Sequence, residues 1–137
     1  SCALPMLPWT LQTLHPTSLP EFHAAQYVRE RIQPGEPIAT NTPYVPFYAD
    51  AKGIMLVSDP KYALSAIPNS PFIRRGNLEE FLATPQADAV RYIVIDRDEP
   101  VCDPNWRDLL DEEFENITSR VPLPERNGIT VMRRKGS

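Results

Sequence analysis

The chain has 137 residues, of which 42% are hydrophobic and 23% charged, and its formal net charge at pH 7 is −4. This length favours one domain with a buried core, and the acidic balance argues against nucleic-acid binding, which needs an electropositive face. Sixteen prolines argue against a helix bundle and favour short elements separated by rigid loops.

The first predicted element is a helix with a clear start signal. Ser18 and Glu21 have the spacing of a capping box, and Pro20 suits the first turn of a helix. Apolar side chains then recur at near-helical spacing as far as Ile32, and Pro34-Gly35 follows as a stop signal. We therefore expect an amphipathic helix that packs one face on the rest of the domain.

Short apolar runs and capped helices alternate along the remaining chain. In order, the predicted elements are a strand at 37–40, a helix at 44–50, a strand at 54–57, a helix at 60–67 capped by Asp59, a helix capped by Asn77 and ended by Pro85, a strand at 92–95, a helix that begins at Asp103-Pro104, and strands at 117–123 and 129–132 around a turn at Asn127-Gly128. This alternation predicts parallel strands joined by right-handed crossovers, with the last two strands as an antiparallel hairpin.

The expected fold class is therefore α/β, as a three-layer Rossmann-like sandwich whose mixed sheet has a parallel core and a C-terminal antiparallel hairpin. Residues 18–135 would form this single domain. The preceding stretch at 3–14 is apolar and broken by prolines. It is either a juxtamembrane arm with Trp9 near the lipid headgroups or an irregular segment packed across the domain, so residues 1–17 are set apart.

The strand at 92–95 holds four β-forming residues and ends in charge at Asp96 and Asp98. A short continuous apolar run predicts a strand buried on both faces, and open α/β sheets place ligands at the carboxyl ends of such strands. Two carboxylates one residue apart could hold a divalent cation against a phosphate. Since no glycine-rich phosphate loop precedes them, we favour a solvated strand edge, without a metal site.

Other reactive side chains suggest no catalytic machinery. Cys2 and Cys102 fit neither a zinc motif nor a Cys-x-x-Cys motif, and they could be two free thiols or one disulfide. His15 and His23 are interpreted as surface histidines. Asn116 begins a formal N-glycosylation sequon, which we interpret as a chance occurrence. We predict no catalytic residue, no metal and no cofactor for this chain.

Five stretches carry a resemblance to a known family. They are the helix and Pro-Gly-x-x-Ile-x-Thr motif at 24–41, the tyrosine-containing run at 43–50, and the runs at 78–82, 92–96 and 129–134. In this order they resemble the soluble C-terminal domain of multi-spanning membrane glycosyltransferases of the dolichyl-phosphate-mannose-protein mannosyltransferase type, which has bacterial and archaeal relatives. The resemblance covers roughly residues 20 to 134.

The resemblance implies a non-catalytic accessory domain on the extracytoplasmic face of a membrane, within a glycosyltransferase that uses a polyprenyl-phosphate sugar donor. The acidic catalytic residues of that family lie in loops between membrane helices, so none is carried over to this chain. The implied partners are the membrane-embedded part of the same parent chain and a glycan or protein acceptor, with no nucleic acid.

Aromatic rings and carboxylates suit sugar stacking and hydroxyl bonding. The candidate substrate-binding residues are therefore Tyr44, Tyr48, Asp96 and Asp98, although the two tyrosines could simply pack on a half-buried helix. Two other functions stay open: a self-contained metal-dependent glycosyl- or phosphoryl-transfer domain that uses Asp96 and Asp98, and an unrelated α/β binding module.

Overall fold

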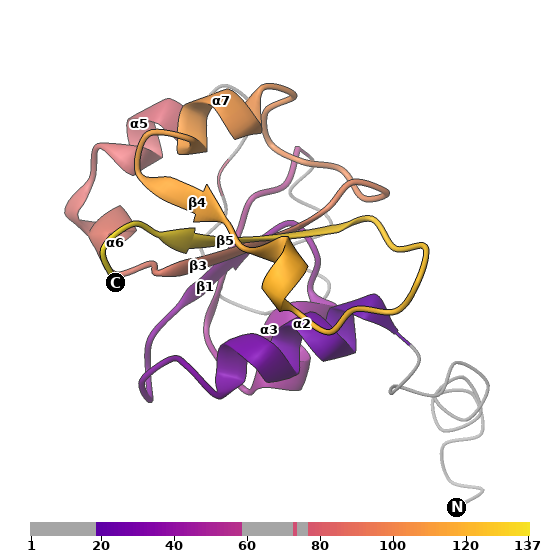
Figure 1. The fold of residues 1–137 in the computed structure, drawn as a ribbon. Coiled ribbons are helices and arrows are strands. Elements are labelled where there is room, and N and C mark those ends of the chain that lie inside the picture. Colours follow the sequence, from indigo (N-terminus) through magenta and orange to yellow (C-terminus); the bar gives the residue numbers. More distant parts are fainter. Residues whose placement is uncertain (1–18, 59–72, 74–76) are drawn as a thin grey trace, which may run out of the picture.

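The computed structural model describes residues 19–58, 73 and 77–137 and contains one five-stranded sheet with the strand order β2-β1-β3-β5-β4 (Figure 1). The strands are β1 (Ile38–Thr40), β2 (Gly53–Met55), β3 (Tyr92–Asp96), β4 (Phe114–Asn116) and β5 (Ile129–Arg134). β1 is parallel to both β2 and β3, whereas β5 is antiparallel to β3 and β4. The predicted mixed sheet with a parallel core and a C-terminal antiparallel pair at one edge is confirmed.

Helices cover both faces of this sheet (Figure 1). On one side lie α2 (Pro20–Arg29) and α3 (Tyr44–Ala49). On the other side lie the short helices α5 (Leu78–Leu82), α6 (Pro85–Asp88) and α7 (Trp106–Leu110). The described residues include no helix long and apolar enough to cross a membrane.

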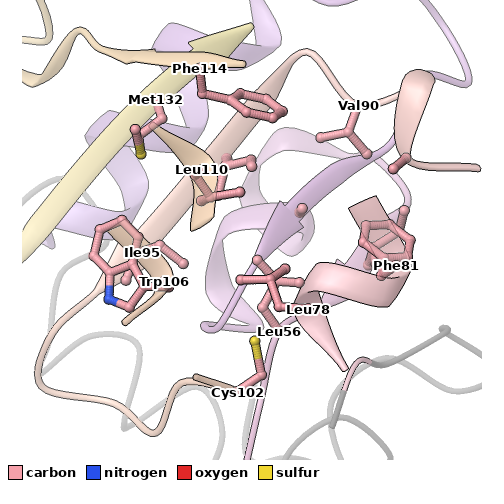
Figure 2. Close-up of a cluster of buried hydrophobic side chains, with 14 residues drawn as sticks. Leu56, Leu78, Phe81, Val90, Ile95, Cys102, Trp106, Leu110, Phe114 and Met132 are labelled. Atoms are coloured by element: carbon pink, nitrogen blue, oxygen red, sulfur yellow. The ribbon is translucent and has the colours of Figure 1, made fainter. Parts of the chain in front are cut away.

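The central strand β3 separates two hydrophobic clusters. Because side chains alternate along a strand, Tyr92 and Val94 pack with α2 and α3, while Ile93 and Ile95 pack with α5, α6 and α7. Figure 2 shows the second cluster, in which Ile95 lies among side chains of these helices and of the neighbouring strands. All five residues of β3 are buried, which confirms the prediction of a strand covered on both faces.

The C-terminal hairpin was predicted in the wrong place. Its first strand is β4, at Phe114–Asn116, and the segment predicted as that strand instead contains a 3-10 helix at Thr118–Arg120. Thr118 accepts a hydrogen bond from the backbone N–H of Val131 through Oγ1 at 2.9 Å, so a side chain takes the place of the next strand partner. The residues after Asn116 include several β-formers, so the sequence pattern predicted a strand where the chain forms a 3-10 helix.

Two helix boundaries also differ from the prediction. α2 begins at Pro20 with Leu19 at the N-cap position and no side-chain cap, while Ser18 lies outside the described residues. Pro85 does not end a helix but opens α6, because proline is favoured in the first turn. The predicted helix at 60–67 lies outside the described residues.

The sheet order fixes where the candidate site lies. β1 is flanked by β2 on one side and β3 on the other, so the chain leaves the carboxyl ends of β1 and β3 in different directions. This reversal is a topological switch point, the usual ligand position in open α/β sheets. It brings the residues after Thr40 next to Asp96.

Candidate functional site: the carboxyl edge of the sheet

Asn41, the first residue after β1, clamps the end of β3. Its Nδ2 donates to the carbonyl oxygens of Asp96 at 2.8 Å and of Glu99 and Pro100 at 3.2 Å. Its Oδ1 accepts from the backbone N–H of Asp96 at 2.8 Å. Asn41 is only 2% exposed, so one buried amide fixes both the strand end and the loop that follows. Sequence reasoning missed the role of this residue, which directly follows the strand predicted at 37–40.

Asp96 and Asp98 lie together at this edge. Asp96 is 7% exposed, and its Oδ1 accepts a 2.9 Å hydrogen bond from the backbone N–H of Asp98. Gly128 lies against both: a Cβ built there would come within 3.0 Å of Asp96 Oδ1 and of Asp98 Oδ2. Arg97 N donates to the Gly128 carbonyl at 3.0 Å. The close approach explains why this position of the turn needs a residue without a side chain.

A third acidic side chain reaches Asp96 from the start of α2. The pKa of Glu21 is raised to about 7, mainly by burial and also by a hydrogen bond with the Asp96 side chain and by the negative charges of Asp96 and Glu99. Burial and the charges of Asp96 and Asp98 also raise the pKa of Glu99. Glu21, Asp96, Asp98 and Glu99 are called the acidic edge below. The sequence analysis interpreted Glu21 only as part of a helix capping box, so its interaction with Asp96 was not predicted.

An aromatic platform lies beside the acidic edge. It consists of Phe22 from α2 and Tyr44, Phe47 and Tyr48 from α3. Tyr48 is its centre: it stacks on Tyr44 with ring centroids 6.3 Å apart and meets Phe22 and Phe47 edge-on at 5.4 Å and 5.3 Å. Tyr44 and Phe47 are 46% and 72% exposed. The rings are thus held against each other by α2 and α3 while two of them still face solvent.

The platform and the acidic edge meet at Glu21. Burial raises the pKa of Tyr48, and the proximity of Tyr44 and then of Glu21 adds to the shift. Glu21 also directly precedes Phe22 in the first turn of α2. The structure therefore brings together all the candidate binding residues, as two pairs: Tyr44 with Tyr48, and Asp96 with Asp98. Glu21 and Phe22, which were not among the candidates, join the pairs.

The acidic edge is not arranged as a metal site. Within the parts of the chain that the structure describes, no group of three or more His, Cys, Asp or Glu side chains could hold a metal ion. One Asp96 carboxylate oxygen already accepts a backbone hydrogen bond. The raised pKa of its neighbour Glu21 favours the protonated carboxyl, which is a poor ligand for a hard cation.

The other reactive side chains lie apart from this edge. Cys102 is a buried free thiol in the cluster of Figure 2, and burial raises its pKa to about 12, which makes it a poor nucleophile. His23 makes an edge-on contact with Phe22 at 5.8 Å. Asn116 is exposed at the end of β4. Cys2 and His15 lie outside the described residues.

Two open cavities lie elsewhere on the surface. One, of about 190 Å³, lies between the end of α2 and the end of α3 and is lined by residues that include Arg29 and Asp50. The other, of about 220 Å³, lies against α5 and includes Phe81. Neither is lined by a residue of the platform or of the acidic edge.

Comparison with known proteins adds no family assignment. A scan against protein-family models found no match, and searches of curated proteins and of solved structures likewise found none. A functional conclusion for this chain therefore rests on its own residues and geometry.

Proposed function

We propose that this chain is a non-catalytic accessory domain of a membrane glycosyltransferase that uses a polyprenyl-phosphate sugar donor, and that it binds the glycan part of an acceptor on the extracytoplasmic side. The binding surface is the aromatic platform together with the acidic edge. The resemblance of the sequence to the C-terminal domain of such enzymes supports the setting. The surface chemistry supports the ligand class.

The observation that carries the proposal is that the aromatic platform lies beside the acidic edge, where Glu21 is near Tyr48 and directly precedes Phe22. A sugar presents an apolar C–H face that can pack on an aromatic ring, and hydroxyls that donate to carboxylates. Tyr44 and Phe47 provide exposed rings, and Glu21 links the platform to Asp96. The exposure of these two rings also leaves them accessible to an acceptor that is part of a larger chain.

A Rossmann-like relationship is part of the same proposal. The parallel order β2-β1-β3 supports it, since doubly wound folds bind their ligands where the strand order reverses. The antiparallel strands β5 and β4 extend the sheet on the far side of β3 from β1.

Titration of the ¹⁵N-labelled chain with mannose-containing oligosaccharides, followed by NMR, tests the proposal. The largest shifts should occur at Tyr44, Phe47, Tyr48 and the loop after Asp96. Tyr44→Ala should weaken binding about tenfold, because an aromatic contact contributes about 0.5–1.5 kcal/mol and 1.4 kcal/mol corresponds to tenfold.

The matched control is Tyr27→Ala. Tyr27 lies on α2, where the guanidinium of Arg31 covers its ring at 3.6 Å, and it is not part of the platform. It should leave the affinity unchanged once circular dichroism shows the variant to be folded. Absence of binding to any acceptor glycan, or an equal loss in both variants, would contradict the proposed site. A coding sequence without membrane spans before Ser1 would contradict the proposed setting.

A further inference from the structure

Among the described residues, the exposed large hydrophobic side chains lie together on the aromatic platform. They are Tyr44 and Phe47, which are 46% and 72% exposed, and both rings contact Tyr48. Single exposed apolar side chains are ordinary on proteins, whereas adjacent ones rimmed by polar groups mark a surface that binds a partner. The platform has such a rim, because the acidic edge lies beside it. A partner with apolar side chains should therefore bind there.

The stretch of chain before α2 has the composition of such a partner. Residues 1–18 lie outside the described residues, and their sequence contains no Asp, Glu, Lys or Arg, so the carboxyls of the acidic edge would not repel this stretch. Residues 3–14 include four leucines, a methionine and a tryptophan. The hydroxyl of Thr10 and the amide of Gln12 are donors that carboxylates can accept from.

Within this stretch, Pro5-Met6-Leu7-Pro8 is a Pro-x-x-Pro motif. Such motifs favour an extended polyproline conformation, which loses little entropy on binding, and they dock on surfaces lined by aromatic rings. The same spacing recurs at 43–46, which begins α3, and at 34–37 and 68–71, where the inner residues are Gly-Glu and Asn-Ser. The motif at 5–8 is thus the apolar one that is not part of the platform itself.

The connection between this motif and the platform is short. Leu19 directly precedes α2, and Phe22 lies in the first turn of that helix. Pro8 precedes Leu19 by eleven residues, which span at most about 40 Å. The rings are much closer together than this: Tyr48 is 5.4 Å from Phe22, and the other two rings are 6.3 Å and 5.3 Å from Tyr48. A tether of this length gives a local concentration of about millimolar, so a weak contact is enough to populate a docked form.

We propose that the Pro-x-x-Pro motif at 5–8, with Trp9 beside it, docks on the aromatic platform of the same chain, so that the protein covers its own exposed rings. The docking does not depend on the proposed function. Its consequence for a sugar ligand does rest on that function: a glycan has to displace the motif from Tyr44 and Phe47, so the motif lowers the apparent affinity for the glycan.

A spin label at Cys2 tests the docking in the whole chain. The other cysteine, Cys102, is 0% exposed and burial raises its pKa to about 12, so a thiol reagent should label Cys2 selectively. Compared with the reduced label, the spin label should broaden the NMR resonances of Tyr44 and Phe47 much more than that of Asp108 on α7, which lies on the other side of the sheet (Figure 1). Equal broadening at these positions, or none at the platform, would overturn the docking.

Variants on both sides of the contact should release it. Phe47→Ser removes a ring that is 72% exposed, so the fold should be kept while the broadening at Tyr44 falls to the level at α7. Pro5→Ala combined with Pro8→Ala should have the same effect. Pro16→Ala changes a proline outside the motif and is the matched control, which should keep the broadening. Broadening that persists in the first two variants, or that is lost equally in the control, is incompatible with the proposed contact.

A mixed sample separates docking within one chain from docking between two chains. When spin-labelled chains without ¹⁵N are mixed with ¹⁵N-labelled chains without a spin label, broadening at Tyr44 reports contact with a second copy alone. Docking within the same chain predicts no broadening in this sample. Broadening as strong as in the chain that carries both labels would show that a second copy covers the platform, and the proposal would be wrong.

The competition with a ligand is read from binding of mannose-containing oligosaccharides. The variant with Pro5→Ala and Pro8→Ala should bind about tenfold more tightly than the wild type if the platform is covered about nine tenths of the time, because the apparent affinity scales with the uncovered fraction. Saturating oligosaccharide should also remove the broadening at Tyr44. Equal affinity of the two chains would overturn the competition. If neither chain binds an oligosaccharide, the proposed function fails, while the spin-label measurements still decide on the docking.

Discussion

At the scale of single residues, the buried amide of Asn41 has the largest structural role at the candidate site. Its four hydrogen bonds join the end of β1 to β3 and to the following loop. Aspartate at the same position would add a charge to the acidic edge and could not donate. An amide is therefore suited to this position because it both donates to carbonyls and accepts from an N–H.

Removal of that amide should be costly. Asn41→Ala would leave the buried backbone N–H of Asp96 without its partner, and a buried polar group left unpaired costs about 1–3 kcal/mol. The Asp96 carbonyl oxygen would still accept from the N–H of Glu99. We expect urea unfolding to show at least about 2 kcal/mol of destabilisation. Gln33→Ala, a change on the loop at the opposite end of the sheet, is the control and should cost less. A loss for Asn41→Ala below that of the control would mean that water replaces the amide.

At the scale of elements, β3 is the strand on which both hydrophobic clusters depend. Val94 is 0% exposed, between β1 and β5. Its side chain packs in the cluster formed with α2 and α3, so it also supports the two helices that carry the aromatic platform.

A charge at this position should unfold the domain. Val94→Asp would bury an unpaired carboxylate at a cost of several kcal/mol, which is comparable to the whole stability of a small domain. Val94→Ala is the matched control because it removes volume without adding charge, and it should lower the melting temperature much less. Similar melting temperatures for the two variants would show that the buried charge is accommodated, contrary to a central position for β3.

At the scale of the whole molecule, the chain should behave as a binding domain without a tight metal site. Calorimetric titration with Mn²⁺, Mg²⁺ and Ca²⁺ should show no micromolar binding. Ca²⁺ is coordinated by about six to eight oxygen ligands, and Mg²⁺ is usually bound together with substrate phosphates. Asp96→Asn combined with Asp98→Asn should leave the chain folded. Micromolar binding that disappears in the double variant would instead favour a metal-dependent transferase.

The sequence by itself determined the main elements and the sheet. Apolar runs with turn signals gave β1, β2 and β3 to within a few residues, because strands buried on both faces need continuous apolar sequence. It also identified Tyr44, Tyr48, Asp96 and Asp98 as candidates from their chemistry. Local sequence patterns did not predict where β4 ends. Just after β4, the Thr118 side chain accepts a hydrogen bond from the backbone N–H of Val131, in place of a strand partner.

Only the tertiary structure decided which polar residues meet. Glu21 and Asp96 are far apart in the sequence, and each has a plausible local role, as a helix cap and as a strand end. The reversal of strand order between β1 and β3 places Asn41 beside Asp96, and the packing of α2 on α3 brings Glu21 and Phe22 to the same place. Burial then changes the chemistry of Glu21, since desolvation depends on what covers a side chain and not on its neighbours in the chain.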